Sequence, residues 1–396
     1  MISVGIDVSK GKSTVCIMKP CGEILESPFE IGHTADELDS LISLIKSFDE
    51  ETRVVMEDTG HYHLPVATYL SSHNIFVCCV NALRMKKFCS QSIRRAKTDK
   101  IDSIKIASFG ITYWNELVKA YPSNVIYDEL KFLARQYYQV TGMLVKSKVN
   151  FSNLLDQVMP KINDVLSNQG ENHKLTEFVS RYIHFQNILD MGEMKFTSDY
   201  CKWAKKKGYR LNERKAAEIL ALAQNGIPTL PNSQSVKIAV SEAVKLIHSI
   251  EESRNTILAQ MQDLCNTLPE YSVVKEMDCI GDTLAPRIIA EIGDVRRFKN
   301  KHSLIAYAGI DAPPYQSGAF HASERHISKR GNSYLRKTGY EIMQSLIKHK
   351  PADNAVYDFI QKKRSEGKCG KEAMIAGLNK FLRVYYGKVM EFYSEH

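Results

Sequence analysis

The sequence lacks the features of a membrane protein or a disulfide-bonded protein. No apolar stretch is long enough to span a bilayer, and the N-terminus has no basic-then-apolar signal segment. The nine cysteines include no Cys-x-x-Cys pair and no partner histidines at zinc spacing. These absences exclude a transmembrane protein, a disulfide framework and a structural zinc site, and they predict a reduced, cytoplasmic protein.

Acidic residues are outnumbered, and the basic excess is clustered. The 396 residues carry 53 Lys and Arg against 45 Asp and Glu, a formal net charge of +8. Basic residues gather within residues 84–100, 202–215, 296–301 and 325–337. A single basic group is usually a solvated face, but several groups, one of them adjoining acidic residues, favour a polyanionic partner such as nucleic acid.

The first hundred residues are typical of an α/β fold. Apolar runs predict strands over residues 2–7, 13–18, 24–25, 53–57 and 75–80. One helix is predicted after the third strand, where Thr34 and Glu37 form a capping box, and another after the fourth strand. Three strands in a meander, then helix, strand, helix and strand, is the order of an RNase H-like fold. In that fold the first and fourth strands lie side by side.

Four acidic residues stand where this fold would gather them. Asp7 ends the first strand, Glu57 ends the fourth, and Asp99 and Asp102 follow a basic segment. Carboxylates past the ends of buried strands face the crevice in which open sheets bind ligands, and residues three apart share a helix face. Such carboxylates repel one another unless cations bind between them. Hard oxygen ligands select Mg²⁺ or Mn²⁺, and a pair of these ions is the usual device for phosphodiester chemistry.

Each acid taken alone is more often a solvated side chain or a turn cap than a metal ligand. The joint placement of the four favours a metal site. Asp58 is the alternative to Glu57, because both lie in the same turn.

The middle of the chain is predicted to be mostly helical. Apolar residues recur at a three/four spacing from Leu130 to Val158, which predicts a long helix within residues 116–160. Residues 161–232 are polar and basic, with glycine and proline breaks, and we interpret them as an inserted helical module. In residues 233–269, apolar residues alternate at steps of four and three, which predicts a coiled-coil helix and hence an oligomer. A helix packed on its own domain is the alternative.

Residues 270–396 are predicted to form a mainly α C-terminal domain. A glycine turn at residues 279–282 opens a short helix and could offer backbone N–H groups to a phosphate, although such turns are usually connectors. Ser317 lies in a glycine- and proline-rich loop, where serine is usually only a loop residue. As a nucleophile it would need a base or a metal and groups that polarise the phosphate. Nearby candidates for these roles are Arg325, His326, Lys329 and Arg330.

These segments together resemble the Piv/MooV-like DEDD transposases of insertion sequences. The N-terminal resemblance lies in Gly5-Ile6-Asp7-Val8-Ser9-Lys10, in Glu57 with Thr59-Gly60, and in Lys97-Thr98-Asp99-Lys100-Ile101-Asp102. The segments that are similar to the family's C-terminal transposase domain are residues 309–318, with Ser317 between Gln316 and Gly318, and Ile327-Ser328-Lys329-Arg330-Gly331-Asn332. The match covers both ends of the chain in the right order. Residues 161–232 match no part of the family that we can place, and Ser103 stands where an alanine is common.

The resemblance implies a RuvC-like DEDD catalytic domain over residues 1–115, within the α/β RNase H-like fold. It implies that Asp7, Glu57, Asp99 and Asp102 bind Mg²⁺, with Mn²⁺ as a possible substitute. It also implies that Ser317 attacks a DNA phosphodiester and holds the strand covalently before strand exchange. The resulting activity is that of an insertion-sequence transposase, or recombinase.

The resemblance also implies partners. These are donor and target DNA, a structured non-coding RNA that guides the choice of DNA, and further copies of the chain in a dimer or tetramer. The acids of one protomer would join the serine of another in one active site. Side chains expected to contact nucleic acid are Arg94, Arg95, Lys97, Arg325, Lys329, Arg330 and Asn332.

Three other functions remain open from the residues. A RuvC-type metal-dependent nuclease that resolves DNA junctions, with water as its nucleophile, would use the same acids. An actin-like ATPase or sugar kinase shares the strand order, and residues 5–7 and 58–60 resemble its phosphate loops, but no second strand meander follows. A non-catalytic RNA-binding protein would leave the four acids without a purpose.

Overall fold

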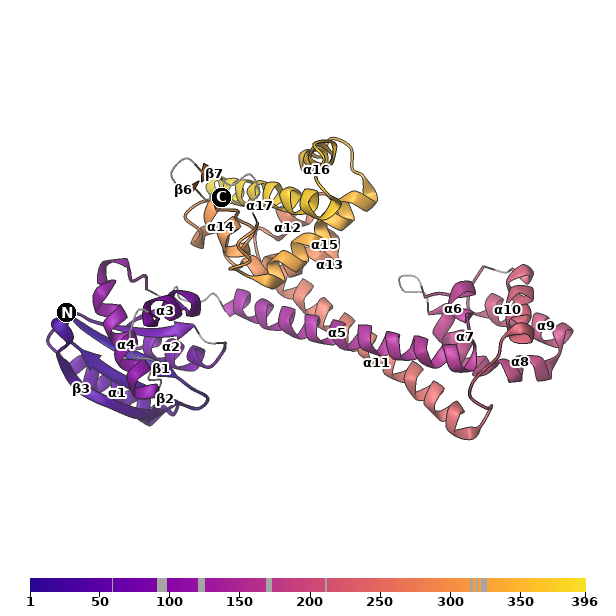
Figure 1. Cartoon of the computed structure of the whole chain (residues 1–396), viewed down its shortest axis with the longest axis horizontal. Helices are drawn as coiled ribbons and strands as arrows, with labels where there is room; N and C mark the ends of the chain where they lie inside the picture. The colour runs from indigo at the N-terminus through magenta and orange to yellow at the C-terminus, as the bar shows by residue number, and fades with distance from the viewer. Residues whose placement is uncertain are drawn as a thin grey trace. The chain divides into compact units, whose positions relative to one another are not determined.

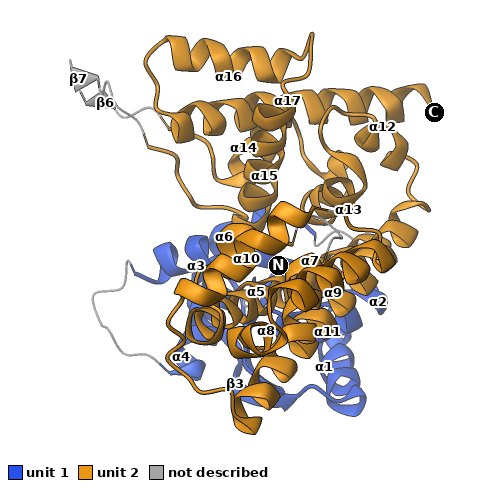
Figure 2. Cartoon of the chain, turned by 90° about the vertical axis from the view of Figure 1, so that its right-hand side faces the viewer, with its two compact units in different colours: residues 1–123 blue, residues 124–396 orange. Residues whose placement is uncertain are grey.

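The structure is a computed structural model that describes residues 1–58, 60–90, 98–119, 125–168, 173–210, 212–313, 316–317, 320–321 and 326–396. For residues 316–317 and 320–321 it describes the backbone alone. The chain divides into two compact units, Met1–Ser123 and Asn124–His396 (Figure 2). No helix in the described ranges is long and apolar enough to cross a membrane.

Unit 1 is built on one mixed five-stranded sheet (Figure 1). Its strands are β1 (Ile2–Val8), β2 (Lys12–Met18), β3 (Ile24–Gly32), β4 (Thr52–Asp58) and β5 (Phe76–Asn81). Their order is β3-β2-β1-β4-β5, with β2 antiparallel to both of its neighbours and β1, β4 and β5 parallel. The prediction that the first and fourth strands pair is confirmed, and the topology fits the RNase H-like fold.

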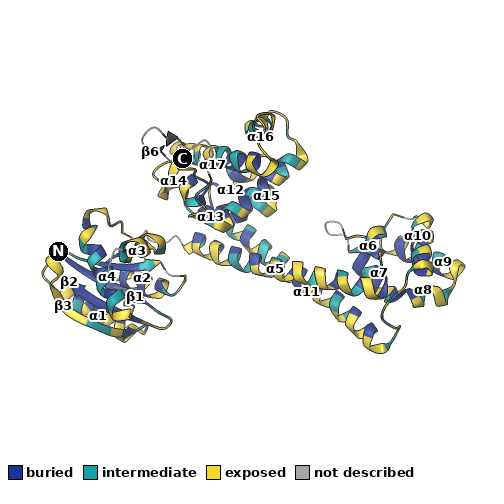
Figure 3. Ribbon diagram, in the orientation of Figure 1, coloured by how far each residue is buried: buried dark blue, intermediate teal, exposed yellow. Residues whose placement is uncertain are grey.

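Helices cover both faces of this sheet. Strands β1 and β2 and the middle of β4 are buried between them, whereas most of the edge strand β3 is not (Figure 3). One face packs against α1 (Ala35–Ser47) and α2 (His63–Ser72) through even-numbered residues of β1 and β4, such as Ile6 and Met56. The other face packs against α3 (Ala82–Cys89) and α4 (Asp99–Thr112) through odd-numbered residues such as Val55. Side chains alternate between the two faces along a strand, so in β1 and β4 even-numbered residues face α1 and α2 and odd-numbered residues face α3 and α4. Two 3₁₀ turns complete the unit, Pro20–Gly22 and Trp114–Glu116.

Helix α4 lies directly on β1 because glycine leaves room for it. A Cβ atom on Gly5 would overlap backbone atoms of Ser103 and Ala107, and one on Gly110 would overlap the side chains of Ser3 and Val55. As α4 advances from residue 103 to 110, its contacts on β1 therefore move from residue 5 back to residue 3. Helix α4 thus runs antiparallel to β1, and its first turn lies at the carboxyl end of that strand.

We expect Gly5→Ala to lower the free energy of unfolding by about 3 kcal/mol or more, since the new methyl group meets helix backbone that cannot turn away. Gly142→Ala is the matched control. It lies within α5 (Val125–Val158) with nothing near its added Cβ, so it should stabilise the protein by about 0.5–1 kcal/mol. Urea unfolding of both variants checks the prediction, and equal changes would contradict the close packing of α4.

Unit 2 is helical and is organised on two long helices, α5 and α11 (Gln234–Cys265), which pack along each other (Figure 1). Residues 127–138 of α5 share a core with residues 261–265 of α11, and residues 144–158 share a second core with residues 236–250. The two helices are therefore antiparallel. The apolar residues that predicted a coiled coil face α5 and its neighbours within the chain. The coiled coil and the oligomer stay predictions.

The second core is completed by five helices between α5 and α11. They are α6 (Ile162–Val165), α7 (Lys174–Tyr182), α8 (Phe185–Met191), α9 (Glu193–Lys206) and α10 (Glu213–Asn225). Their buried residues, including Phe178, Phe196 and Tyr200, pack on the ends of the two long helices. We call residues 161–232 the helical module.

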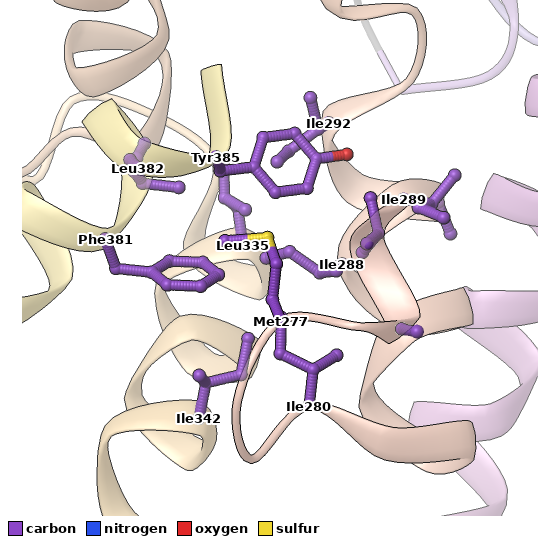
Figure 4. Close-up of a cluster of buried hydrophobic side chains, with 14 of the residues drawn as sticks. Met277, Ile280, Ile288, Ile289, Ile292, Leu335, Ile342, Phe381, Leu382 and Tyr385 are labelled. Carbon is purple, nitrogen blue, oxygen red and sulfur yellow. The ribbon is translucent and has the colours of Figure 1, made fainter. Parts of the chain in front are cut away.

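The first core belongs to the C-terminal part of unit 2. Its helices are α12 (Tyr271–Lys275), α13 (Gly281–Ile292), α14 (Lys301–Ala308), α15 (Ser333–His349), α16 (Ala355–Ser365) and α17 (Gly370–Glu395), with a 3₁₀ turn at Val295–Arg297. Figure 4 shows Ile288, Ile342 and Tyr385 of three of these helices meeting in this core. A short hairpin of β6 (Gln316–Ser317) and β7 (Phe320–His321) lies between α14 and α15. The domain boundaries expected from the sequence stay a prediction.

Candidate active site

The first two acids lie side by side on the sheet. In the parallel pairing of β1 with β4, Ile6 is opposite Met56, so the next residues are Asp7 and Glu57. Both have odd numbers and therefore face α3 and α4, and both are partly buried. Two carboxylates thus lie at the carboxyl ends of neighbouring parallel strands, where open sheets place their ligand sites.

Asp58 lies on the opposite face of the sheet from Glu57. Its Oδ1 is 3.5 Å from Nε2 of His63, the first residue of α2, and His63 is buried. The Cys79 side chain packs on the α1 and α2 side of the sheet. Its pKa is raised mainly by burial, and the negative charge of Asp58 raises it further. The structure therefore places Glu57, and not Asp58, on the same face as Asp7.

Helix α4 supplies the other two acids. Thr98 caps the helix, since its hydroxyl oxygen accepts a hydrogen bond from the Ile101 N–H at 3.3 Å. Asp99 and Asp102 both lie in the first turn, which is the turn at the carboxyl end of β1. Asp102 is partly buried and Asp99 is exposed. Asp102 lies 3.5 Å from the Lys105 ammonium, one turn further along the helix.

Cys89, at the end of α3, lies near enough to three of the acids and to Lys105 for their charges to affect its pKa. Burial raises the pKa of its thiol, Lys105 lowers that pKa, and the negative charges of Asp102, Glu57 and Asp7 each raise it. The thiol of Cys89 therefore interacts electrostatically with three of the four acids and with Lys105, the lysine beside Asp102. Sequence reasoning missed Cys89 and Lys105, because neither stands in a recognisable motif.

The donor chemistry of this edge fits a hard divalent cation, since every candidate ligand is a carboxylate. Within the described part of the chain, no three His, Cys, Asp or Glu side chains already converge closely enough to hold a metal ion. Asp102 points to Lys105 instead. A cation bound between the acids would therefore compete with Lys105 for the Asp102 carboxylate.

Several predicted site residues lie outside the described residues. These are Arg94, Arg95, Lys97 and Arg325, and the side chain of Ser317. The backbone of Ser317 is in β6, where it pairs with Phe320 of β7. His326, Lys329 and Arg330 are described, and all three are exposed.

The two ends of the Ser317 loop are fastened together. The Ser328 hydroxyl donates to Oδ1 of Asp311 at 2.5 Å, and the Ser328 N–H donates to the Asp311 carbonyl at 2.8 Å. Further along, Gly309 and Gly331 come so close that a Cβ on either would overlap the other's backbone. Arg336 donates to the carbonyls of Ala308, at 2.9 Å, and Gly331, at 3.1 Å. The two ends of the segment that carries Ser317 are therefore held together in a closed base.

A buried carboxylate holds this base to the rest of unit 2. Glu291 of α13 is 1 % exposed; it forms a bidentate ion pair with Arg135 of α5 and accepts a hydrogen bond from Nδ2 of Asn332 at 2.8 Å. Oδ1 of Asn332 caps α15 by accepting from Tyr334 and Leu335. Both ends of the Asn332 amide, expected from sequence to contact nucleic acid, are thus used within the fold. Sequence reasoning missed Glu291 and Arg135, which lie far apart in the chain.

Two family models match the chain at both ends. A model described as "Transposase", of the DEDD type of IS110, matches residues 4–160, and one described as "Transposase IS116/IS110/IS902 family" matches residues 271–358. The acids lie in the first matched range and Ser317 in the second. Residues 161–270 lie in neither.

Individual proteins match as well. An insertion element IS110 uncharacterized 43.6 kDa protein of Streptomyces coelicolor is 22 % identical over 299 residues, 76 % of this chain and 72 % of that protein. An insertion element IS116 uncharacterized 44.8 kDa protein of Streptomyces clavuligerus is 22 % identical over 378 residues, 95 % of this chain and 91 % of that protein. The pilin gene-inverting protein of Moraxella bovis is 26 % identical over 136 residues, 33 % of this chain and 42 % of that protein.

Among solved structures, RuvC of T. thermophilus in complex with a Holliday junction substrate aligns with 29 % of this chain and 96 % of that chain, at 10 % identity and a TM-score of 0.23.

Proposed function

Because the chain belongs to the IS110/IS116 family of insertion-element transposases, enzymes that cut and rejoin DNA, we propose that it recombines DNA through a metal-bound acidic site and a serine nucleophile. The observation that carries the proposal is the placement of Asp7, Glu57 and the first turn of α4 at one edge of the sheet. A second support is the closed base that joins the two ends of the Ser317 segment.

In this proposal Asp7, Glu57, Asp99 and Asp102 hold Mg²⁺, for which Mn²⁺ could substitute. The bound ions would neutralise charge on the phosphate and lower the pKa of the attacking hydroxyl. Lys105, 3.5 Å from Asp102, would offset part of the negative charge of the acids. Cys89, at the end of α3, lies close enough to Asp102, Glu57 and Asp7 for their charges to raise the pKa of its thiol, after the larger effect of burial.

Ser317 is the nucleophile of the proposal. Its hydroxyl oxygen would form a bond to the phosphorus of a DNA phosphodiester while one of the two bonds from that phosphorus to a sugar oxygen breaks. One DNA end would leave with a free hydroxyl group, and the end that keeps the phosphate would stay bound to the serine. Lys329 and Arg330 are exposed on the same loop and would bind the phosphate oxygens. The closed base would hold these groups in place during the transfer.

We further propose that the active enzyme is an oligomer, a dimer or tetramer, in which the acids of one protomer meet Ser317 of another. The apolar seam of α11 is used within the chain, so contacts between protomers must use another surface. A structured non-coding RNA would select donor and target DNA. The basic residues are compatible with such an RNA, although charge reads the backbone of a nucleic acid and not its sequence.

The test is a denaturing gel of the purified protein with labelled DNA, Mg²⁺ and any RNA that co-purifies. Wild type should yield a protein–DNA adduct that both Ser317→Ala and Asp102→Ala abolish. Ser333→Ala, a change of an exposed serine at the start of α15, is the control and should keep the adduct. Cleavage without an adduct, lost only in Asp102→Ala, would instead identify a RuvC-type nuclease that uses water.

A further inference from the structure

We infer that the helical module binds the phosphate backbone of the DNA substrate through a row of lysines on α9. This α9 lysine row consists of Lys195, Lys202 and Lys206, with Lys205 beside it, and all four lysines are exposed. It lies between residues 161 and 270, which neither family model covers. The inference rests on DNA being the substrate in the proposed function, but not on the chemistry at Ser317.

The lysines of the row lie on one face of α9. With 3.6 residues per turn, Lys195, Lys202 and Lys206 lie within about 20° of one line along α9, and they span about 17 Å of its axis. The opposite face is buried through Phe196, Tyr200 and other residues of the second core. The helix is thus held rigidly, and the ammonium groups extend from a fixed scaffold.

Two other lysines of the module are paired with acids within the chain. Lys207 pairs with Glu177 at 3.0 Å, and Lys215 pairs with Glu218 at 3.0 Å. Over the described ranges, no ion pair joins a lysine of the α9 row to an acid.

Asp199 is the acid nearest to the row along α9, and it is already committed. Arg181 donates to both of its carboxylate oxygens, at 2.9 and 2.6 Å. This pairing is the largest cause of the lowered pKa of Asp199, to which Lys202 adds a smaller effect. The carboxylate therefore subtracts little from the positive charge of the row.

The helix dipole does not account for the row. Lysines in the last turn, such as Lys205 and Lys206, are favoured there by the negative end of the dipole. Lys195 is in the first turn, where the dipole disfavours a positive charge. A row of lysines that extends to the N-terminal end of the helix is better explained by the binding of a polyanion.

A duplex is the partner that this geometry fits. DNA carries one phosphate per about 3.4 Å of axis on each strand, so a row of about 17 Å lies along several successive phosphates. The row carries no group placed to read base edges, and we therefore expect binding that is independent of sequence. Along α5, about 30 Å separate Arg135, at the base of the Ser317 loop, from residue 155 in the module core, so the module core lies apart from that base.

The test compares wild type with a triple variant, Lys195→Gln, Lys202→Gln and Lys206→Gln. Fluorescence anisotropy with a labelled 40-base-pair duplex of arbitrary sequence would give the affinity at several salt concentrations. We expect about a 10- to 100-fold loss of affinity at about 0.1 M salt, and a salt slope that is smaller by about 2.7. The control replaces three exposed lysines elsewhere, Lys46→Gln, Lys371→Gln and Lys388→Gln, and should change the affinity less than threefold.

Other outcomes overturn the inference. Equal losses in both triple variants would show a general effect of net charge, and no loss in either would show that the row is only solvated. A loss for a structured RNA of similar length, with unchanged duplex binding, would reassign the row to RNA. Because affinity is the readout, a wild type that binds duplex through the row and yet forms no adduct would contradict the proposed function alone.

Discussion

Glu57→Gln is expected to lower the rate of Mg²⁺-dependent DNA cleavage by about 10³-fold, whereas Asp58→Asn should leave it within about twofold. The two residues are adjacent in β4, but they lie on opposite faces of the sheet. Glu57 lies beside Asp7 and under α4, and Asp58 lies beside His63 of α2. A lost metal ligand removes several kcal/mol of transition-state stabilisation, and about 4 kcal/mol corresponds to 10³ in rate.

The pair is a sharp control because the substitutions are chemically alike. Each one replaces a carboxylate by the amide of the same size, and each removes one negative charge from the same strand. The Asp58 side chain is 56 % exposed, so its loss should change the unfolding free energy by less than about 1 kcal/mol. General electrostatic effects on DNA binding should therefore be equal in the two variants.

Single-turnover cleavage at saturating DNA, with urea unfolding as a check of the fold, would measure both effects. A large loss in Asp58→Asn with little loss in Glu57→Gln would place the metal site on the α2 face. Similar losses in both variants would mean that cleavage depends on the negative charge at the end of β4, and not on the face of the sheet that the carboxylate occupies.

Glu291→Gln is expected to destabilise unit 2 by about 3 kcal/mol and to slow formation of the DNA adduct at Ser317. The Glu291 side chain is fully buried and compensates Arg135, whose own side chain is 29 % exposed. Breaking a buried ion pair from one side leaves the other charge without its partner, which costs about 3–5 kcal/mol. We expect the lower end, because water reaches part of Arg135.

The effect on the adduct follows from what else Glu291 holds. It accepts from Asn332, which caps α15 at the end of the Ser317 loop. A looser cap would let the closed base of the loop open, and the nucleophile would lose its fixed position. Metal-dependent cleavage activity that uses water, if any is detected, should not change.

Glu366→Gln is the matched control for stability. Glu366 also accepts from a cation, Lys363, at 2.6 Å, but the Glu366 side chain is 39 % exposed. An exposed pair contributes no more than about 1 kcal/mol. Urea unfolding curves of the two variants should therefore separate clearly, and coincident curves would show that the Glu291 pair contributes nothing special to the fold.

Much of unit 1 could be predicted from the sequence. Short apolar runs with turn residues between them identified the strands, and their order determined that β1 and β4 are neighbours. The placement of Asp7 and Glu57 side by side followed from that order, because each lies one residue before the end of its strand. Local patterns suffice here, since a strand, its turns and its hydrophobic face are all encoded over a few successive residues.

Only the tertiary structure showed that Glu57, and not Asp58, shares a covered face with Asp7, because the surroundings of a side chain depend on which helices cover each side of the sheet. It also decided what buries the apolar face of α11. Periodicity shows that a face is buried but not by what, and the partner is α5 of the same chain. The same holds for the ion pair of Glu291 with Arg135, which joins residues 156 positions apart. Such contacts leave no local pattern in the sequence, because the two side chains meet only after the helices that carry them have packed.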